Sequence, residues 1–334
     1  MKKVSGYLLP ILLAAFLLWY AYRDQDFSLM FSEFAKASPG AIALTFLTTI
    51  FAHWFRALRW NMLFEPLGFQ SSKAGSFLAV MSGYFANLLV PRAGEISRCT
   101  ILSASEDIPI PSAIGTVLAE RSFDMLMLLL IALAAFGMEY ETLSQFLFRM
   151  QDKYSINGGD SSQLKIILVG ILAISGLLIY LNRKRLARIP AIEKILGMLW
   201  GLIDGLLSVT RLKQPFLFLL YTAFIWGGYY FTTYFSLKMF GFTHDLGFQA
   251  AFMLLIVGSF GIVVPVPGAV GGPFQIFVSA ALTQLYHKDP MMSITAASMM
   301  YWSQVLFSLS GGGLCYLLAI IKANERKKLE KIHV

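Results

Sequence analysis

The sequence predicts an all-α integral membrane protein, a helical bundle of seven to eight spans in which some helices are broken or re-enter the membrane. Hydrophobic residues make up 57% of the 334 residues and charged residues 14%, and the mean hydropathy is +0.66. Soluble domains carry about 25% charged residues. Several apolar runs reach about 18 residues, enough to cross a hydrocarbon core of about 30 Å. These observations exclude a soluble enzyme and predict one transmembrane domain over 1–334.

Nine hydrophobic segments are expected along the chain, with short loops between them. Their approximate ranges are 8–22, 39–64, 74–90, 111–138, 164–181, 215–239, 247–264, 270–286 and 294–321. Helices are favoured over strands because backbone polar groups in lipid must bond within their own segment. The first segment has aromatic residues, Trp19 and Tyr20, where a signal peptide would have a small-residue cleavage site, so we expect a retained helix.

The distribution of lysine and arginine predicts the orientation. With the N-terminus inside, 19 of the 27 basic residues lie on the cytoplasmic side. Both termini are therefore expected in the cytoplasm, including a basic tail over 322–334. The segment 190–212 is amphipathic with cations at both ends, which predicts an interfacial helix. Its glycine stripe offers a possible homodimer contact.

Two segments show proline and glycine breaks. A full crossing at 74–90 would invert the charge asymmetry, so we expect a re-entrant motif near 74–110 that turns near Pro91. A second broken segment is expected near 255–286. The stretches 85–94 and 259–268 share three aliphatic residues, proline, two residues and glycine, which suggests an internal inverted repeat. The break residues are Pro91, Gly94, Pro265, Pro267, Gly268 and Gly271. Paired broken segments point to a transporter site, since half-helix N-termini favour an anion such as phosphate.

Three charged residues, Arg92, Glu95 and Arg98, surround the first break. Arginine suits bidentate recognition of phosphate. The alternative is an ordinary basic loop at the membrane surface. Glu95 argues against that alternative, because the positive-inside bias requires no carboxylate.

Glu120, Arg121 and Asp124 interrupt the apolar stretch from 114 to 136. Ionisable groups inside a span are costly unless they are paired or hydrated. At a spacing of four, Glu120 and Asp124 share a helix face, with Arg121 beside them. We expect these three residues to couple to the arginines of the first break. The alternative is an ion-pair cluster that only holds helices together.

The end of the second segment carries Arg56, Arg59 and Trp60. The simplest interpretation is that both arginines snorkel to the cytoplasmic interface beside a belt tryptophan. His53 is too isolated for a metal site, and we assign it no chemistry.

Four motifs now resemble a known family. They are Asn87–Arg98, Glu120–Asp124, Pro265–Gly271 and Arg59–Trp60. The first three motifs in this order, together with Arg59–Trp60, resemble the lysylphosphatidylglycerol synthase transmembrane region over most of the chain, from about 5 to 320. This is a flippase-like module that also occurs as stand-alone proteins. In this sequence Phe274 stands where the family pattern has a glutamate, so no role of that acid is carried over. The soluble domain that attaches lysine is absent, and lipid aminoacylation is not implied.

The resemblance implies translocation of an anionic or zwitterionic phospholipid, or of a lipid-linked headgroup, between leaflets. The expected substrate-binding residues are Arg59, Asn87, Arg92, Glu95, Arg98, Glu120, Arg121 and Asp124. The alternatives are a membrane-embedded transferase or accessory subunit acting on polyprenyl-phosphate-linked sugar, and a scaffold that recruits envelope-biosynthesis enzymes.

Further expectations concern chemistry and partners. No nucleophile elbow, Walker A loop or HExxH motif occurs, so we expect no enzyme activity, no cofactor and no metal. Basic residues flank hydrophobic segments, which favours lipid headgroups over nucleic acid as the partner. The expected location is a bacterial or archaeal cytoplasmic membrane.

Overall fold

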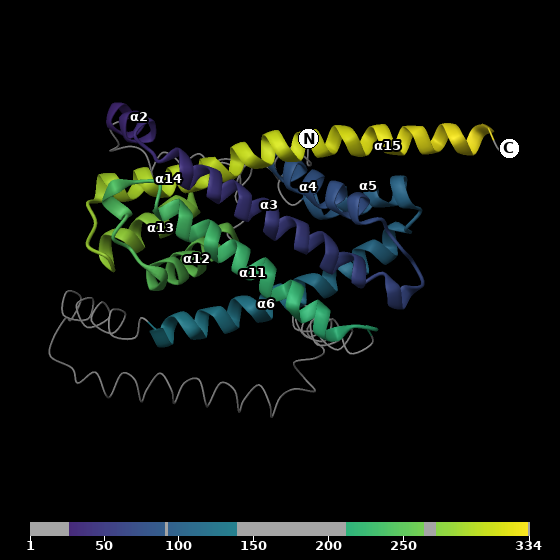
Figure 1. Ribbon diagram of the computed structural model, residues 1–334, viewed down its shortest axis with the longest axis horizontal. Coiled ribbons are helices and arrows are strands. Elements are labelled where there is room, and N and C mark those ends of the chain that lie inside the picture. Colours follow the sequence, from purple (N-terminus) through teal and green to yellow (C-terminus); the bar gives the residue numbers. More distant parts are fainter. Residues whose placement is uncertain (1–26, 91–92, 139–211, 264–271, 333–334) are drawn as a thin grey trace, which may run out of the picture.

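The computed structural model describes residues 27–90, 93–138, 212–263 and 272–332 (Figure 1). This part of the chain is helical and contains no strand. Its helices are α2 (Phe27–Ala35), α3 (Pro39–Met62), α4 (Lys73–Leu89), α5 (Ala93–Glu106), α6 (Ile110–Met138), α11 (Pro215–Leu237), α12 (Phe248–Val263), α13 (Pro273–Gln284), α14 (Pro290–Phe307) and α15 (Gly313–Ile332). The expected segments in this part are confirmed as helices.

Helices α3 and α11 form the central antiparallel pair. The backbone N–H of Ser38, the N-cap of α3, donates to the carbonyl of Met239 just after α11, at 2.9 Å. Midway along the pair, a Cβ on Gly228 would lie 2.8 Å from Cβ of Ala52, so only glycine permits this approach. With 24 residues, α3 is about 36 Å long, more than a hydrocarbon core of about 30 Å.

Helices α4 and α5 form an antiparallel hairpin, in which the start of α4 contacts the end of α5. The Ser72 hydroxyl, which caps α4, donates to Oε1 of Glu106 at the end of α5, at 2.6 Å. Near the turn, the backbone N–H of Gly94 donates to Oδ1 of Asn87 at 2.7 Å. A Cβ on Gly94 would clash with the carbonyl oxygen of Gly83. Gly94 is therefore required by close packing of the hairpin.

Helices α12 and α13 form a second hairpin, in which the residues before α12 also contact the residues after α13. Gly258 and Gly261 of α12 lie against Phe274 of α13. At the open ends, Nζ of Lys288 pairs with Oδ1 of Asp245 at 2.7 Å. The residue that departs from the family pattern, Phe274, is thus a packing residue of this hairpin.

The two hairpins open toward opposite ends of the molecule. Each hairpin follows one member of the antiparallel α3–α11 pair, and Figure 1 shows α4 and α5 at the right and α12 and α13 at the left. The order of long helix, short hairpin and long helix therefore occurs twice, in opposite directions. An inverted repeat would produce this arrangement.

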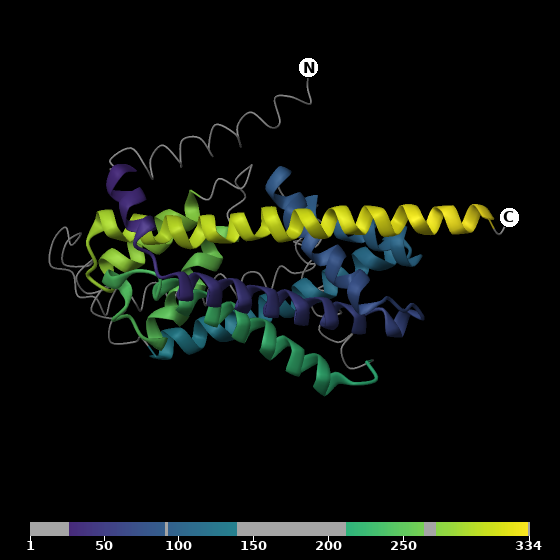
Figure 2. The ribbon, with the colours of Figure 1, turned by 45° about the horizontal axis from the view of Figure 1, so that its top comes forward.

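Helices α14 and α15 form one nearly continuous rod (Figure 2). A π-helical turn at Ser308–Gly312 joins them. A Cβ on Gly312 would lie 2.8 Å from the carbonyl oxygen of Met81, so this turn packs directly on α4. The basic tail from Lys322 continues α15 as helix.

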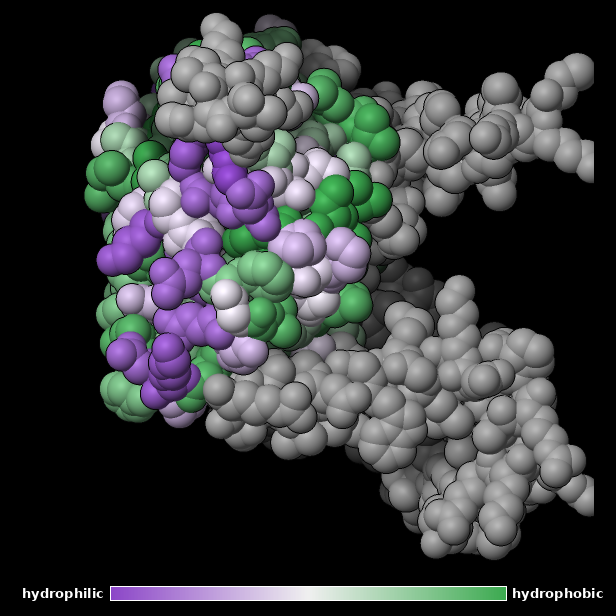
Figure 3. Space-filling model, turned by 90° about the vertical axis from the view of Figure 1, so that its right-hand side faces the viewer, coloured by the Kyte–Doolittle hydropathy of each residue, from purple (hydrophilic) through white to green (hydrophobic). Residues whose placement is uncertain are grey.

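Apolar side chains cover the flanks of the long helices, and polar ones cover the ends. Leu47 on α3, Leu133 on α6 and Leu317 on α15 are 59–61% exposed. Figure 3 shows hydrophilic residues gathered over the end where α3 finishes and α4 begins. Two helical stretches among the described residues, Pro39–Leu67 and Pro290–Arg326, are long and apolar enough to cross a membrane.

Several expected features lie outside the described residues. They are the segments 8–22 and 164–181, most of the interfacial helix 190–212, the turn residues Pro91 and Arg92, and Pro265, Pro267, Gly268 and Gly271. The count of seven to eight spans and the orientation of the termini therefore stay predictions.

Candidate functional site

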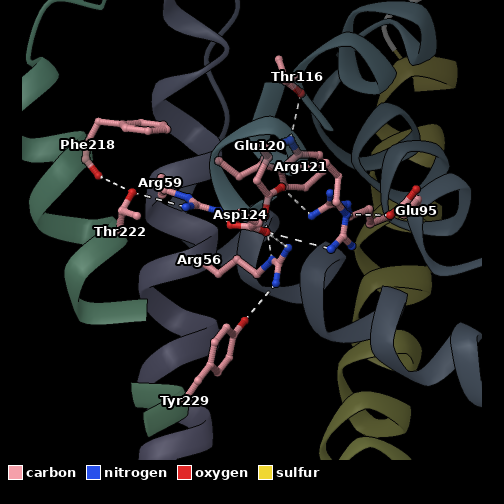
Figure 4. A network of polar contacts seen from close by, with 12 residues as sticks. Arg56, Arg59, Glu95, Thr116, Glu120, Arg121, Asp124, Phe218, Thr222 and Tyr229 are labelled. Carbon is pink, nitrogen blue, oxygen red and sulfur yellow. Dashed lines mark hydrogen bonds and ion pairs between the residues drawn. The ribbon is translucent and has the colours of Figure 1, made fainter. Parts of the chain in front are cut away.

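A cluster of charged side chains lies where α3, α5 and α6 meet (Figure 4). Glu120 of α6 is fully buried and forms ion pairs on both of its oxygens: Nε of Arg56 lies 2.6 Å from Oε1, and Nη1 of Arg98 lies 2.8 Å from Oε2. One turn later, Asp124 pairs with Nη2 of Arg56 at 2.8 Å and Nη2 of Arg59 at 2.6 Å. Glu120 also lies 3.4 Å from Nη2 of Arg59, so each carboxylate pairs with more than one arginine.

Glu120 and Asp124 share one face of α6, as their spacing predicts. Arg121 lies at the edge of this buried core, with its Nη1 4.0 Å from Oδ2 of Asp124. Its Nε pairs with Oε1 of Glu95 at the start of α5, at 2.7 Å, and both side chains are nearly half exposed. We refer to Arg56, Arg59, Glu95, Arg98, Glu120, Arg121 and Asp124 together as the charge cluster.

The expectation that Arg56 and Arg59 snorkel to the interface is wrong. Arg56 is 5% exposed and Arg59 is 0% exposed, because their stripe of α3 faces α6 and α11. Trp60 is also fully buried, and its Nε1 donates to the Thr116 hydroxyl at 2.9 Å. The two arginines are thus internal partners of the carboxylates of α6.

Aromatic side chains enclose the cluster. Nη1 of Arg56 donates to the hydroxyl groups of Tyr84 and Tyr229, at 3.0 and 2.9 Å. The guanidinium carbon of Arg98 lies 4.8 Å from the centre of the Trp60 ring. Such cation–π contacts hold a guanidinium in place without using its N–H donors.

The charge cluster contains one more positive than negative charge, since four arginines face three carboxylates. Among the described residues, three N–H donors of the cluster, Nε and Nη2 of Arg98 and Nε of Arg59, and one acceptor, Oε2 of Glu120, are buried without a hydrogen-bond partner. Buried polar atoms are nearly always bonded, so unbonded ones require an explanation. The excess charge and the free donors together suit an anion.

A cavity lies beside these donors, next to the break in the α4–α5 hairpin. Its lining includes Arg56, Tyr84, Glu95, Arg98 and Arg121. The cavity volume is about 20 Å³, room for one water molecule. A phosphate group requires more space, so the hairpin and α6 must separate before a headgroup enters.

The structure brings together most of the residues expected from the sequence. Arg59, Arg98, Glu120 and Asp124 form the buried core, whereas Arg121 and Glu95 form the exposed pair. Asn87 lines the cavity and binds the backbone of the hairpin turn. The described residues hold no group of three potential metal ligands.

Four residues at the site were not expected there from the sequence: Arg56, His53, Tyr84 and Tyr229. His53 is buried one turn before Arg56, and its ring lies 4.1 Å from that of Tyr84. The sequence does carry a signal for Arg56 and His53. Thr45, Thr49, His53, Arg56 and Arg59 follow helical spacing within an apolar segment, a polar stripe that indicates burial against another helix.

The amino-acid sequence is similar to that of a known protein family. The family model described as the lysylphosphatidylglycerol synthase TM region matches residues 7–322. The chain belongs to this family. As a member of a transmembrane family with apolar helix flanks, it is an integral membrane protein.

Two relatives are similar over part of the chain. A protein named glycosyltransferase AglD, from Haloferax volcanii, is 30% identical over 142 residues, which is 40% of this chain and 22% of that protein. A UPF0104 membrane protein, MJ1595 from Methanocaldococcus jannaschii, is 30% identical over 105 residues, 30% of this chain and 31% of that protein. The matches thus span less than a third of either relative's length. No solved structure matches.

Proposed function

We propose that the protein translocates an anionic or zwitterionic phospholipid, or a lipid-linked headgroup, between membrane leaflets. One observation carries this proposal: the charge cluster has an excess positive charge, and Arg98 beside the cavity has buried N–H groups without a hydrogen-bond partner among the described residues. A headgroup phosphate supplies the missing negative charge and accepts these donors in a charge-assisted geometry.

The burial of the cluster favours a role in binding over a role in packing alone. Each charge moved into the membrane is costly unless it is paired and hydrogen-bonded. A cluster that served only to join α3, α5 and α6 would be most stable with equal numbers of each charge and no free donors. The surplus on the arginine side is the feature that a bound anion explains.

We propose that both hairpins are re-entrant, each entering and leaving on one side of the membrane. The meeting of Ser72 with Glu106 and of Asp245 with Lys288 supports this topology. The α5 helix begins at Ala93, beside the cavity, so its N-terminal dipole adds to the attraction for phosphate.

Translocation requires the cavity to open while the acyl chains remain in the bilayer. The Arg121–Glu95 pair is the contact between α6 and the start of α5 that faces outward. Exposed ion pairs contribute at most about 1 kcal/mol, so this pair can exchange Glu95 for a phosphate at little cost. Arg121 would then receive the headgroup, and Arg98 would hold it deeper in the protein.

An accessory role with polyprenyl-phosphate-linked sugar is the second candidate, favoured by the name of the relative glycosyltransferase AglD. Such a substrate also presents a phosphate to the charge cluster.

A catalytic role for Glu120 or Asp124 is disfavoured, because the oxygens of both carboxylates are already occupied by ion pairs with arginines. Cytoplasmic termini, a homodimer through 190–212 and contact with envelope enzymes remain parts of the proposal.

The test is translocation of acyl-labelled phosphatidylglycerol in proteoliposomes, followed by reduction of the outer-leaflet fluorophore with dithionite. Arg98→Gln should reduce the rate by about tenfold, the loss expected from one charge-assisted hydrogen bond to phosphate. Lys288→Gln, which removes a cation outside the charge cluster, is the control and should retain the wild-type rate. Folded Arg98→Gln protein with the wild-type rate would refute the proposed site.

A further inference from the structure

A second polar feature continues from the charge cluster along α3. Five side chains from α3, α11 and α14, which we call the polar track, form it: Thr48, Thr49, His53, Thr232 and Gln304. Thr49 Oγ1 lies 3.4 Å from Oε1 of Gln304 and 3.3 Å from Oγ1 of Thr232. The track therefore joins three helices at the level of one turn of α3.

His53 connects the polar track to the charge cluster. It lies on α3 one turn after Thr49 and one turn before Arg56. Its ring packs at a tilt against Tyr84, whose hydroxyl accepts from Arg56. From Thr49 to Arg56 the rise along α3 is about 10 Å. His53 therefore lies between the two features, and the rest of the polar track lies one turn of α3 further from the charge cluster.

His53 also shows that the track has unused binding capacity. Its Nδ1 is buried and has no hydrogen-bond partner among the described residues. Packing alone leaves this atom unexplained, because buried polar groups are normally bonded. The threonine and glutamine side chains bond one another across the helices, and such bonds exchange for bonds to a ligand hydroxyl with little net change in free energy.

The charges around the track determine which headgroups fit. None of the five track residues carries a carboxylate. Each of the three carboxylates of the neighbouring charge cluster is already paired with arginine, and the cluster as a whole is positive. An ammonium group desolvated here would meet net repulsion, whereas a hydroxyl would find donors and acceptors.

We propose that the polar track binds the uncharged, hydroxyl-bearing part of an anionic headgroup while the charge cluster holds its phosphate, so that the protein selects against headgroups that carry an amine. This inference rests on the proposed function and narrows its substrate class from anionic or zwitterionic lipids to anionic lipids of the phosphatidylglycerol type. It assigns His53, Thr49 and Gln304 as specificity-determining residues.

The experiment compares acyl-labelled phosphatidylglycerol with acyl-labelled phosphatidylethanolamine in phosphatidylcholine proteoliposomes. The wild-type protein should move phosphatidylglycerol at least about fivefold faster, the effect of one or two net hydrogen bonds and an unpaired ammonium. Gln304→Glu places a carboxylate on the track at nearly constant volume and should reverse this preference. Gln284→Glu adds the same charge at an exposed position of α13 and should leave the preference unchanged.

A second pair of variants guards against misfolding. Thr49→Val removes the hydroxyl and should slow phosphatidylglycerol alone, whereas Thr49→Ser keeps the hydroxyl and should retain the preference. Thr295→Val is the matched control, because this threonine is equally buried and its hydroxyl donates to the carbonyl of Met291 in its own helix, α14. Two results would overturn the inference on headgroup selection but not the proposed function. One is equal rates for the two lipids in the wild-type protein, and the other is an unchanged, wild-type preference in folded Gln304→Glu and Thr49→Val proteins. Movement of neither lipid by the wild-type protein would instead overturn the proposed function.

Discussion

Replacing Glu120 by glutamine tests whether the charge cluster is an anion site or a structural joint. The substitution keeps the volume and removes the negative charge that Arg56 and Arg98 share, at 2.6 and 2.8 Å. The cluster excess then rises from one positive charge to two. Because breaking a buried ion pair leaves an uncompensated charge, we expect the free energy of unfolding to fall by about 3–5 kcal/mol.

The same change should act on function in the opposite sense. With less internal neutralisation, the arginines should bind a phosphate-bearing lipid more tightly and release it more slowly. We therefore expect a lower translocation rate together with a lower Kd for phosphatidylglycerol, measured by lipid binding in detergent. Unfolding is followed by titration with sodium dodecyl sulfate.

A double substitution separates the two roles. Glu120→Gln with Arg98→Gln restores the original excess charge, so the two losses of stability should be less than additive by about 0.5–3 kcal/mol. Additive losses would show that the two side chains are not coupled. If Glu120→Gln lowers stability but leaves the lipid Kd and the rate per folded molecule unchanged, the cluster is structural and the anion-site reasoning is refuted.

Three further predictions concern the hairpins. Gly94→Ala should prevent close packing of α4 and α5 and reduce the yield of folded protein, measured by size-exclusion chromatography, because its Cβ would clash with the facing backbone. The hydrogen bond from Lys288 lowers the pKa of Asp245 below its usual value of about 3.8. The ion pair should therefore stabilise the folded protein above pH 3.8, and this stabilisation should disappear as the pH falls through the lower pKa of the folded state. Lys288→Gln should abolish this small, salt-sensitive contribution, measured by thermal unfolding at pH 2–5. In a cysteine-free background, cysteines at Lys73 and Ala104 should react with an impermeant reagent from one side of the membrane and a cysteine at Asp245 from the other.

A different result would contradict each of the three hairpin predictions. Normal yield of Gly94→Ala, equal to that of Gly115→Ala where a Cβ meets open space, would contradict the packing argument. An unchanged acid-unfolding profile after Lys288→Gln would show that the ion pair is absent in solution. Labelling of Lys73 and Ala104 from opposite sides would show that the α4–α5 segment crosses the membrane completely.

The sequence by itself determined the helices and much of the candidate site. Long apolar runs set the bounds of α3, α6 and α11 to within a few residues, and proline and glycine marked the α4–α5 turn. The spacing of Glu120 and Asp124 placed both on one face of α6. These features depend on the periodicity and conformational preferences of neighbouring residues, which a sequence carries directly.

Only the tertiary structure decided which side chains face one another. An arginine near the end of an apolar segment has the same local sequence whether it snorkels to the interface or turns inward, so Arg56 and Arg59 were misplaced. The pairing of Arg121 with Glu95, the contact of His53 with Tyr84 and the junction of α3, α11 and α14 at the polar track all join distant segments. Such contacts arise from the packing of whole helices, because helical periodicity fixes the face a residue occupies but not the helix that covers that face.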